Sequence, residues 1–259
     1  MKKFLLFAIV CFSAVLFAED VIYYPEFENS VSFYASFDTA TADADISEGR
    51  ERPIAVLGKL NFADGIRGKA LLCGKGGANV RYARKDNFTF QHPGTLLFFF
   101  KAINWKTTPG SRVFFTGIES AKGFFGLQIP GWPKEVCPCS RPLHTMFLYS
   151  KKIPGKTFSA KLPGGEAECG KWHMIAFSWA PGQLRVNMDN QPGKTYQINF
   201  DLTDDAFPYE VFSVGSQADR NFLLDEYTIY SRRLSDGEIA EIFILRQTAL
   251  IPSPATLTV

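Results

Sequence analysis

Residues 221–244, NFLLDEYTIYSRRLSDGEIAEIFI, place a strand directly before a helix start near the end of the chain. The first half, residues 222–230, is dense in β-branched and aromatic side chains, which favour a β-strand. In the second half, Ser235 and Glu238 have the spacing of a capping box, in which the serine caps the helix and the glutamate reaches back to the serine amide. We therefore expect a strand followed by one short helix over residues 235–244.

Short strand-like segments separated by turns fill the chain before this point. Residues 31–38 alternate apolar side chains on one face. Residues 94–104, GTLLFFFKAIN, form the most apolar run after the leader and predict a central strand that is buried on both faces. Residues 171–190 predict two strands joined by a turn at residues 180–183. This pattern is typical of an all-β chain.

Several motifs occur in an order that is found in one protein family. They are Phe37-Asp38, Gly65-x-x-Gly68-Lys69-Ala70-Leu71, Trp172-His173, Trp179, Asp189-Asn190 and, in the closing segment, Asp225-Glu226, Tyr230, Leu234-Ser235 and Glu238-Ile239. Together they resemble the laminin-G-like jelly rolls of the concanavalin A-like lectin/glucanase superfamily. The resemblance implies an all-β, two-sheet antiparallel jelly-roll sandwich (concanavalin A-like) over residues 31–245, with one short C-terminal helix.

Three segments lie outside this pattern. Residues 130–143, PGWPKEVCPCSRPL, are an insertion whose prolines cannot belong to an interior strand. Residues 19–30 are an aromatic lead-in, and residues 246–259 are a Pro- and Thr-containing C-terminal tail.

The start of the chain predicts export. Two lysines, an uncharged run over residues 4–18 and an acidic pair at residues 19–20 are typical of a secretory signal peptide, which we assign to residues 1–18. The alternative is an uncleaved membrane anchor, but the run is shorter than a bilayer crossing requires. We expect a secreted or periplasmic bacterial protein without a membrane span after cleavage.

The charge balance argues against nucleic acid as a partner. The formal net charge is +2, and no run of Lys and Arg is longer than two residues. Binding to nucleic acid requires a concentrated basic surface.

Four cysteines remain after the leader with Cys11 is removed: Cys73, Cys137, Cys139 and Cys169. An even number in an exported chain predicts two disulfide bonds. Cys137 and Cys139 flank one proline and are poorly placed to pair with each other. We therefore expect each of them to pair with Cys73 or Cys169. A zinc site is the alternative, although the spacing lacks the usual C-x₂₋₄-C pairs.

A cation is expected at the closing strand. By alternation along this strand, Asp225 shares a face with Leu223 and Tyr227, and a buried carboxylate requires a counter-charge or a metal. The resemblance implies structural Ca²⁺ held by Asp225 and by oxygens near Asp38, and hard oxygen ligands suit this ion. The alternative is that Asp225 accepts hydrogen bonds from loop amides or pairs with Arg232.

The same resemblance implies ligand binding without catalysis. Catalytic glucanases of this fold carry Glu-x-Asp-x-Glu on one strand, and this chain lacks that motif. We expect a non-catalytic carbohydrate-binding (lectin-like) module, or one that binds a cell-surface protein. Trp132 and Trp105 are the candidates to stack on sugar rings, because both lie outside the predicted core strands. The alternatives are a glycoside hydrolase or lyase with an unrecognised site, and a structural or adhesion domain of the cell envelope.

Overall fold

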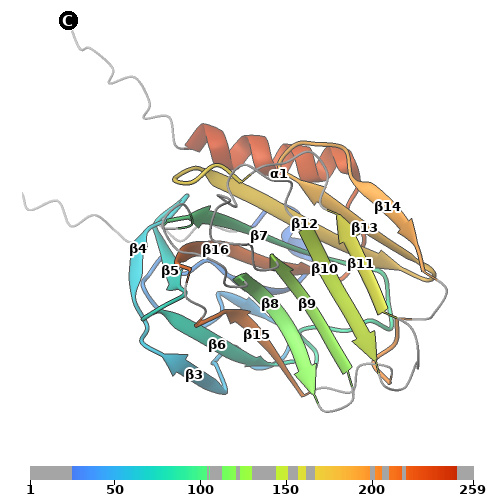
Figure 1. Cartoon of the computed structure of the whole chain (residues 1–259), viewed down its shortest axis with the longest axis horizontal. Helices are drawn as coiled ribbons and strands as arrows, with labels where there is room; N and C mark the ends of the chain where they lie inside the picture. Colours follow the sequence, from blue (N-terminus) through green and yellow to red (C-terminus); the bar gives the residue numbers. More distant parts are fainter. Residues whose placement is uncertain are drawn as a thin grey trace, which may run out of the picture.

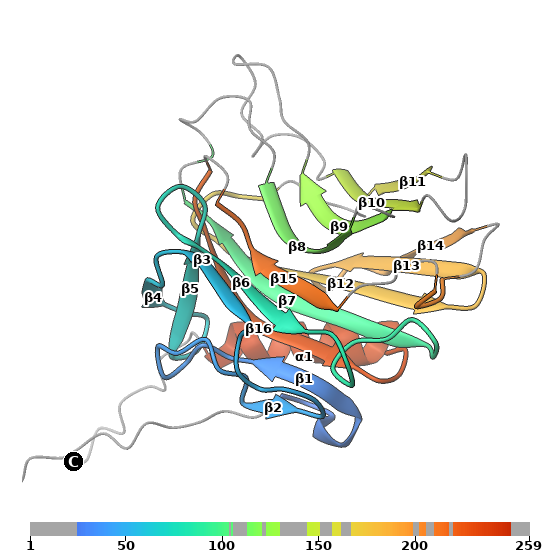
Figure 2. The same ribbon diagram turned by 90° about the horizontal axis from the view of Figure 1, so that it is seen from below.

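The computed structural model describes residues 25–103, 105, 113–120, 123–129, 144–150, 157–161, 167–198, 202–205, 210–217 and 220–249. The predicted signal peptide, the insertion with Trp132, Cys137 and Cys139, and most of the predicted tail lie outside these residues. The described chain forms two antiparallel sheets that pack face to face, with one α-helix on the outside (Figures 1 and 2). The predicted fold class is confirmed.

The first sheet has nine strands. Its main path runs β14 (Lys194–Gln197), β13 (Gln183–Met188), β12 (Trp172–Ala180), β7 (Gly94–Ala102), β16 (Phe222–Tyr230), β1 (Val31–Ala35) and β2 (Ile46–Ser47), while β5 (Lys69–Cys73) joins β16 and β4 (Phe62–Asp64) joins β5. The most apolar run after the predicted leader, β7, lies between β12 and β16 as predicted. It is almost entirely buried because the second sheet covers one face and the helix covers the other.

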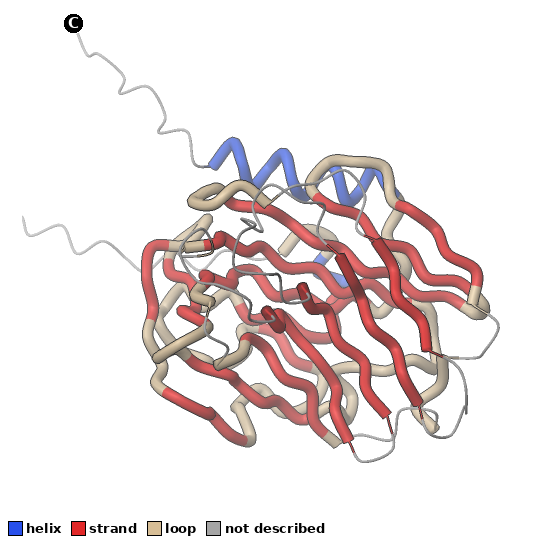
Figure 3. Tube along the Cα trace, in the orientation of Figure 1, coloured by secondary structure: helices blue, strands red, loops and turns tan. Residues whose placement is uncertain are grey.

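The second sheet has seven strands. In order, they are β11 (Thr157–Lys161), β10 (His144–Ser150), β9 (Gly123–Ile129), β8 (Val113–Ser120), β15 (Val211–Gly215), β6 (Ala78–Ala83) and β3 (Ala55–Gly58). Figure 3 shows how strands account for most of the molecule. Between the sheets lies an aromatic core, in which Phe33, Phe98 and Phe212 contact Tyr227 ring to ring.

The helix α1 (Asp236–Ala249) covers the outer face of the first sheet. It begins where predicted, because the Glu238 carboxylate accepts a hydrogen bond from the Ser235 amide at 2.8 Å and the Ser235 hydroxyl accepts one from the Glu238 amide at 3.2 Å. It continues past residue 244, into the segment predicted as a tail. Ile239 and Ile242 pack on the sheet, whereas buried Arg246 anchors the last turns. No helix of the described residues combines the length and apolar character that a membrane crossing needs.

The single 3-10 helix of the described part, η1 (Glu28–Ser30), leads into β1.

The sequence Asn87-Phe88-Thr89 matches a glycosylation signal. Asn87 is 0% exposed, and its amide makes hydrogen bonds with Ser47, Gly49, Arg50 and Ala83. Because both ends of this amide are engaged inside the fold, Asn87 is a structural residue that ties two loops together.

Candidate functional site

A β-bulge in β16 creates the most distinctive polar site of the described residues. The pairing of β16 with β7 shifts between Asp225 and Thr228, and Glu226 has a positive φ of 55°. The bulge reverses the alternation along the strand: Leu223 faces the helix side, whereas Tyr227 faces the inter-sheet core. The predicted alternation is therefore wrong at this point, because it assumed a regular strand.

The bulge lies where β16 changes its pairing partner. Before it, residues 222–224 pair with β5; after it, residues 227–230 pair with β1. The turn that leads into β5 and the loop that leaves β1 therefore both meet Asp225 and Glu226. This arrangement brings Asp38 to the closing strand, as predicted from the sequence.

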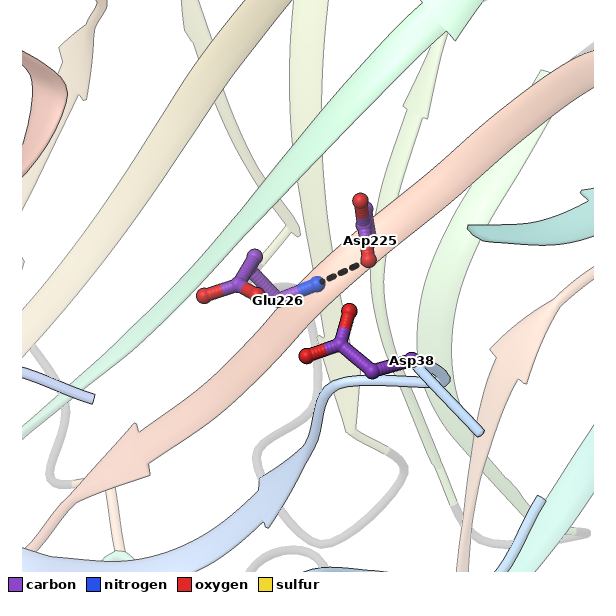
Figure 4. A group of neighbouring side chains, drawn as sticks. All are labelled: Asp38, Asp225 and Glu226. Atoms are coloured by element: carbon purple, nitrogen blue, oxygen red, sulfur yellow. Dashed lines mark hydrogen bonds between the residues drawn. The ribbon is translucent and has the colours of Figure 1, made fainter. Parts of the chain in front are cut away.

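Three carboxylates converge here (Figure 4). One oxygen from each of Asp38, Asp225 and Glu226 lies within 4.8 Å of the other two. Asp225 is 0% exposed and Glu226 is 1% exposed. The structure thus brings together both predicted metal ligands and adds Glu226, which the sequence reasoning missed.

The turn at residues 65–68 closes over these carboxylates. Oδ2 of Asp225 accepts a hydrogen bond from the Ile66 amide at 2.7 Å. A Cβ on Gly65 would overlap the Asp225 carboxylate, and one on Gly68 would overlap that of Asp38. Gly68 also has a positive φ of 42°, a conformation that glycine adopts at least cost. The Gly-x-x-Gly motif is therefore the tight lid of the acidic cluster.

Glu226 has counter-charges on several sides. Its Oε2 lies 2.8 Å from Nη2 of Arg67 and 2.8 Å from Nε of Arg246, while the Tyr34 hydroxyl donates to the carboxylate at 3.1 Å. The predicted alternative partner, Arg232, pairs instead with Glu238 at 2.6 Å. The positively charged side chains of this site come from the turn and from α1.

Asp38 lacks such compensation. Both of its carboxylate oxygens are buried and have no hydrogen-bond partner among the described residues. Burial, and then the charge of Glu226, raise the pKa of Asp38 from 3.8 to about 7. The same two causes raise the pKa of Asp225 well above its ordinary value. A proton or a cation would relieve the charge that Asp38 and Asp225 share at this site.

The donor set fits a hard cation. Asp38 and Asp225 together offer carboxylate oxygens, and Asp38 has no competing donor in the described fold. Oxygen ligands of this kind suit Ca²⁺. The two arginines pair with Glu226, and the Gly-x-x-Gly turn packs against Asp38 and Asp225.

The other predicted ligand-binding residues lie apart from this cluster. Trp105 is 0% exposed, and its ring stacks on Phe100 with the centroids 5.9 Å apart. The expectation that Trp105 is an exposed aromatic is wrong: it follows β7 directly and turns inward to fill the core between the sheets. Trp132 lies outside the described residues.

The disulfide prediction fails at Cys73. Cys73 is a free, buried thiol in β5, packed so tightly on β15 that a Cβ on Gly215 would meet its sulfur. It lies in the core between the sheets and forms no disulfide bond. Cys169 is a disulfide cysteine, and its partner lies outside the described residues. The predicted bond from Cys137 or Cys139 to Cys169 stays a prediction, because both residues lie outside the described residues.

The Trp-His and Asp-Asn motifs form a structural clamp. Nε2 of His173 accepts a hydrogen bond from the Glu168 amide at 2.9 Å, so Nδ1 carries the proton and donates to Asp189 at 3.0 Å. Asp189 also accepts a hydrogen bond from the Met174 amide at 2.8 Å. The histidine therefore fixes the ends of the β12–β13 hairpin.

Comparison with known proteins shows which solved structures share this architecture. No protein-family model and no curated protein sequence matches the chain. Among solved structures, it resembles domain 4 of AbnA, a GH43 extracellular arabinanase from Geobacillus stearothermophilus, in complex with arabinotriose. The TM-score is 0.60 at 18% identity, over 83% of this chain and 98% of that domain. The two share a fold.

Neurotoxin binding domains are similar to a comparable degree. The binding domain of botulinum neurotoxin DC, solved in complex with rat synaptotagmin II, matches with a TM-score of 0.63 at 12% identity. The match covers 85% of this chain and 52% of that one, so the chain spans about half of the neurotoxin domain. The same binding domain in complex with SialylT gives a TM-score of 0.61 at 12% identity, with coverage of 85% and 52%. The chain shares a β-sandwich fold with these domains, which were solved in complex with arabinotriose, synaptotagmin II and SialylT.

Proposed function

We propose that the chain is an exported, non-catalytic carbohydrate-binding module of the laminin-G-like, concanavalin A-like type. The observation that carries this proposal is the fold match over 98% of the arabinanase domain, a complete domain solved with a bound trisaccharide. A module that binds without catalysis also agrees with the absence of the Glu-x-Asp-x-Glu motif from the sequence. Trp132, on the insertion at residues 130–143, is the proposed stacking aromatic, because exposed aromatic rings pack on the apolar faces of sugars.

A calcium ion is the proposed structural cofactor. Asp38 and Asp225 are its proposed ligands, and Glu226 sets the charge around them. Support comes from the buried, unpartnered oxygens of Asp38 and from the glycine turn that closes the cluster. When bound, the ion would supply the positive charge that the two aspartates lack.

The proposal is tested with the mature chain, residues 19–259, on a panel of neutral, amino and acidic oligosaccharides that includes arabinotriose. Binding is measured with Ca²⁺ and with EDTA, for the natural chain and for Trp132→Ala. We expect saturable binding of at least one neutral oligosaccharide and a loss of about tenfold or more on removal of the indole. Released reducing sugar is measured in the same samples.

The other outcomes separate the alternatives. Sugar release would favour a glycoside hydrolase or lyase and contradict the non-catalytic module. The absence of binding to any sugar, with the chain folded, would overturn the carbohydrate-binding proposal. It would leave a structural domain or a protein-binding domain. The neurotoxin binding domain in complex with synaptotagmin II is an example of the protein-binding kind.

A further inference from the structure

Two cavities open on either side of the segment His92-Pro93, at the end of the sandwich where β7 begins and where β12 and β16 end. Their volumes are about 180 Å³ and about 170 Å³. His92, Pro93 and Trp179 line both, so the two cavities adjoin. We refer to them together as the His92 cavity pair.

The two cavities differ in chemistry. The first is lined mainly by apolar side chains: Phe90, Trp179, Pro181 and Leu202. The lining of the second includes two acidic residues, Glu48 and Asp86, beside Ser32, Thr89 and Ser231 and apolar residues such as Ile229. An apolar wall beside a few convergent polar groups is typical of small-ligand sites.

The wall between these cavities is held rigidly. Asp204 accepts hydrogen bonds from the Thr89 hydroxyl at 2.6 Å and from the Phe90 amide at 2.8 Å, and it pairs with buried Arg84. Nε1 of Trp179 donates to the His92 carbonyl at 2.7 Å, which ties the loop to β12. A loop fixed in this way presents its outward side chains at little entropic cost to a ligand.

Those outward side chains are available. Glu48, Asp86 and His92 are exposed, and within the described residues no hydrogen bond or ion pair engages their side chains. Nearby polar groups such as Asn87 and Ser32 are instead fully used inside the fold. The rigid wall and the free carboxylates are therefore separate sets of residues.

We propose that the His92 cavity pair binds one ring of a neutral or amino sugar. This inference rests on the proposed function, and it names a sugar subsite in addition to the stacking proposed for Trp132, with its ligand class. The carboxylates of Glu48 and Asp86 accept hydrogen bonds from adjacent hydroxyls or from a sugar ammonium group, bonds that the carboxylate charge strengthens. The apolar cavity covers the C–H face of the ring. A uronic or sialic acid is disfavoured, because its carboxylate would face two others.

Calorimetric titration of the mature chain with arabinotriose, glucosamine and glucuronic acid tests the site. The variants are Glu48→Gln and Asp86→Asn, singly and together. Asparagine tolerates the left-handed backbone of Asp86, whose φ is 63°. The matched control is Glu241→Gln, an exposed carboxylate on α1. Because the side chains of Glu48 and Asp86 make no hydrogen bond or ion pair within the described fold, we expect an unchanged unfolding temperature in each variant.

We expect arabinotriose or glucosamine to bind at least tenfold more tightly than glucuronic acid. Each variant should weaken that binding by about tenfold, since each removes one charge-assisted hydrogen bond, while Glu241→Gln should not change it. Sugar binding that both variants leave unchanged would overturn this site but leave the proposed function intact. Tighter binding of glucuronic acid would also overturn it. No binding of any sugar by the natural chain would overturn both.

Discussion

Replacing Glu226 by alanine is expected to lower the free energy of unfolding by about 3–5 kcal/mol, the loss typical of breaking a buried ion pair. The carboxylate lies 2.8 Å from both Arg67 and Arg246, and it accepts a hydrogen bond from Tyr34. Its removal takes away the carboxylate that forms ion pairs with both buried arginines. Chemical denaturation of the natural chain and the variant measures the difference.

The matched control is Asp64→Ala. Asp64 also pairs with a cation at 2.8 Å, but that partner, Lys69, is half exposed and Asp64 itself is on the surface. Water replaces such a pair at almost no cost, so we expect no measurable change in stability. Equal effects of the two substitutions would contradict the assignment of Glu226 as the buried centre of this charge network.

Calcium is expected to reverse the effect of Asp38→Asn on stability. In EDTA, the folded chain holds a proton on Asp38 up to a pKa of about 7, against 3.8 ordinarily. Its stabilising contribution is thus present below about pH 4 and is lost as the pH rises through 7. The neutral asparagine does not titrate. The advantage of the variant over the natural chain should therefore grow as the pH rises from 5 to 8, and it should be largest at pH 8.

With saturating Ca²⁺ at pH 8, the order should invert. A cation compensates the two aspartates only in the natural chain, and a ligand at about a hundred times its Kd adds about 2.7 kcal/mol of stability. Thermal unfolding of both chains at pH 5 and pH 8, with EDTA and with Ca²⁺, measures the crossing. A natural chain that stays less stable than Asp38→Asn at pH 8 in Ca²⁺ would contradict the cation.

The strands and the helix start could be predicted because each depends on local sequence. The apolar run of β7 and the capping box of Ser235 and Glu238 are local patterns, and both are confirmed. The predicted end of α1 was wrong, because the end depends on residues that are distant in sequence. Its last turns are held by Arg246, whose partners Glu26 and Glu226 are distant in sequence.

In the candidate site, too, some residues could be predicted from the sequence and others could not. The resemblance of the motifs brought Asp38 and Asp225 together correctly. Glu226 was missed because a bulge changes which side of the strand a residue faces, and this chain marks the bulge with no glycine. Arg67 lay within the Gly-x-x-Gly motif, so its place beside the closing strand could have been inferred from that turn.

The residues judged by type alone were the least predictable. Trp105 follows a core strand and turns into the core, although its position outside the strand favoured exposure. Cys73 is one of four cysteines in the predicted mature chain, and that even number favoured a disulfide bond. It packs instead between the sheets as an apolar side chain. In both cases burial depends on the path of the chain after the strand and on the facing sheet, which residue type does not specify.

The cation at Asp38 and Asp225 is tested most directly by counting bound calcium. The mature chain is dialysed against EDTA and then against free Ca²⁺ up to about 1 mM, which is the largest dissociation constant typical of extracellular calcium sites. Metal content per chain is then measured for the natural protein and for Asp38→Asn and Asp225→Asn. We predict one calcium per natural chain and none in either variant. No bound calcium in the natural chain, or one that both variants retain, would contradict the site.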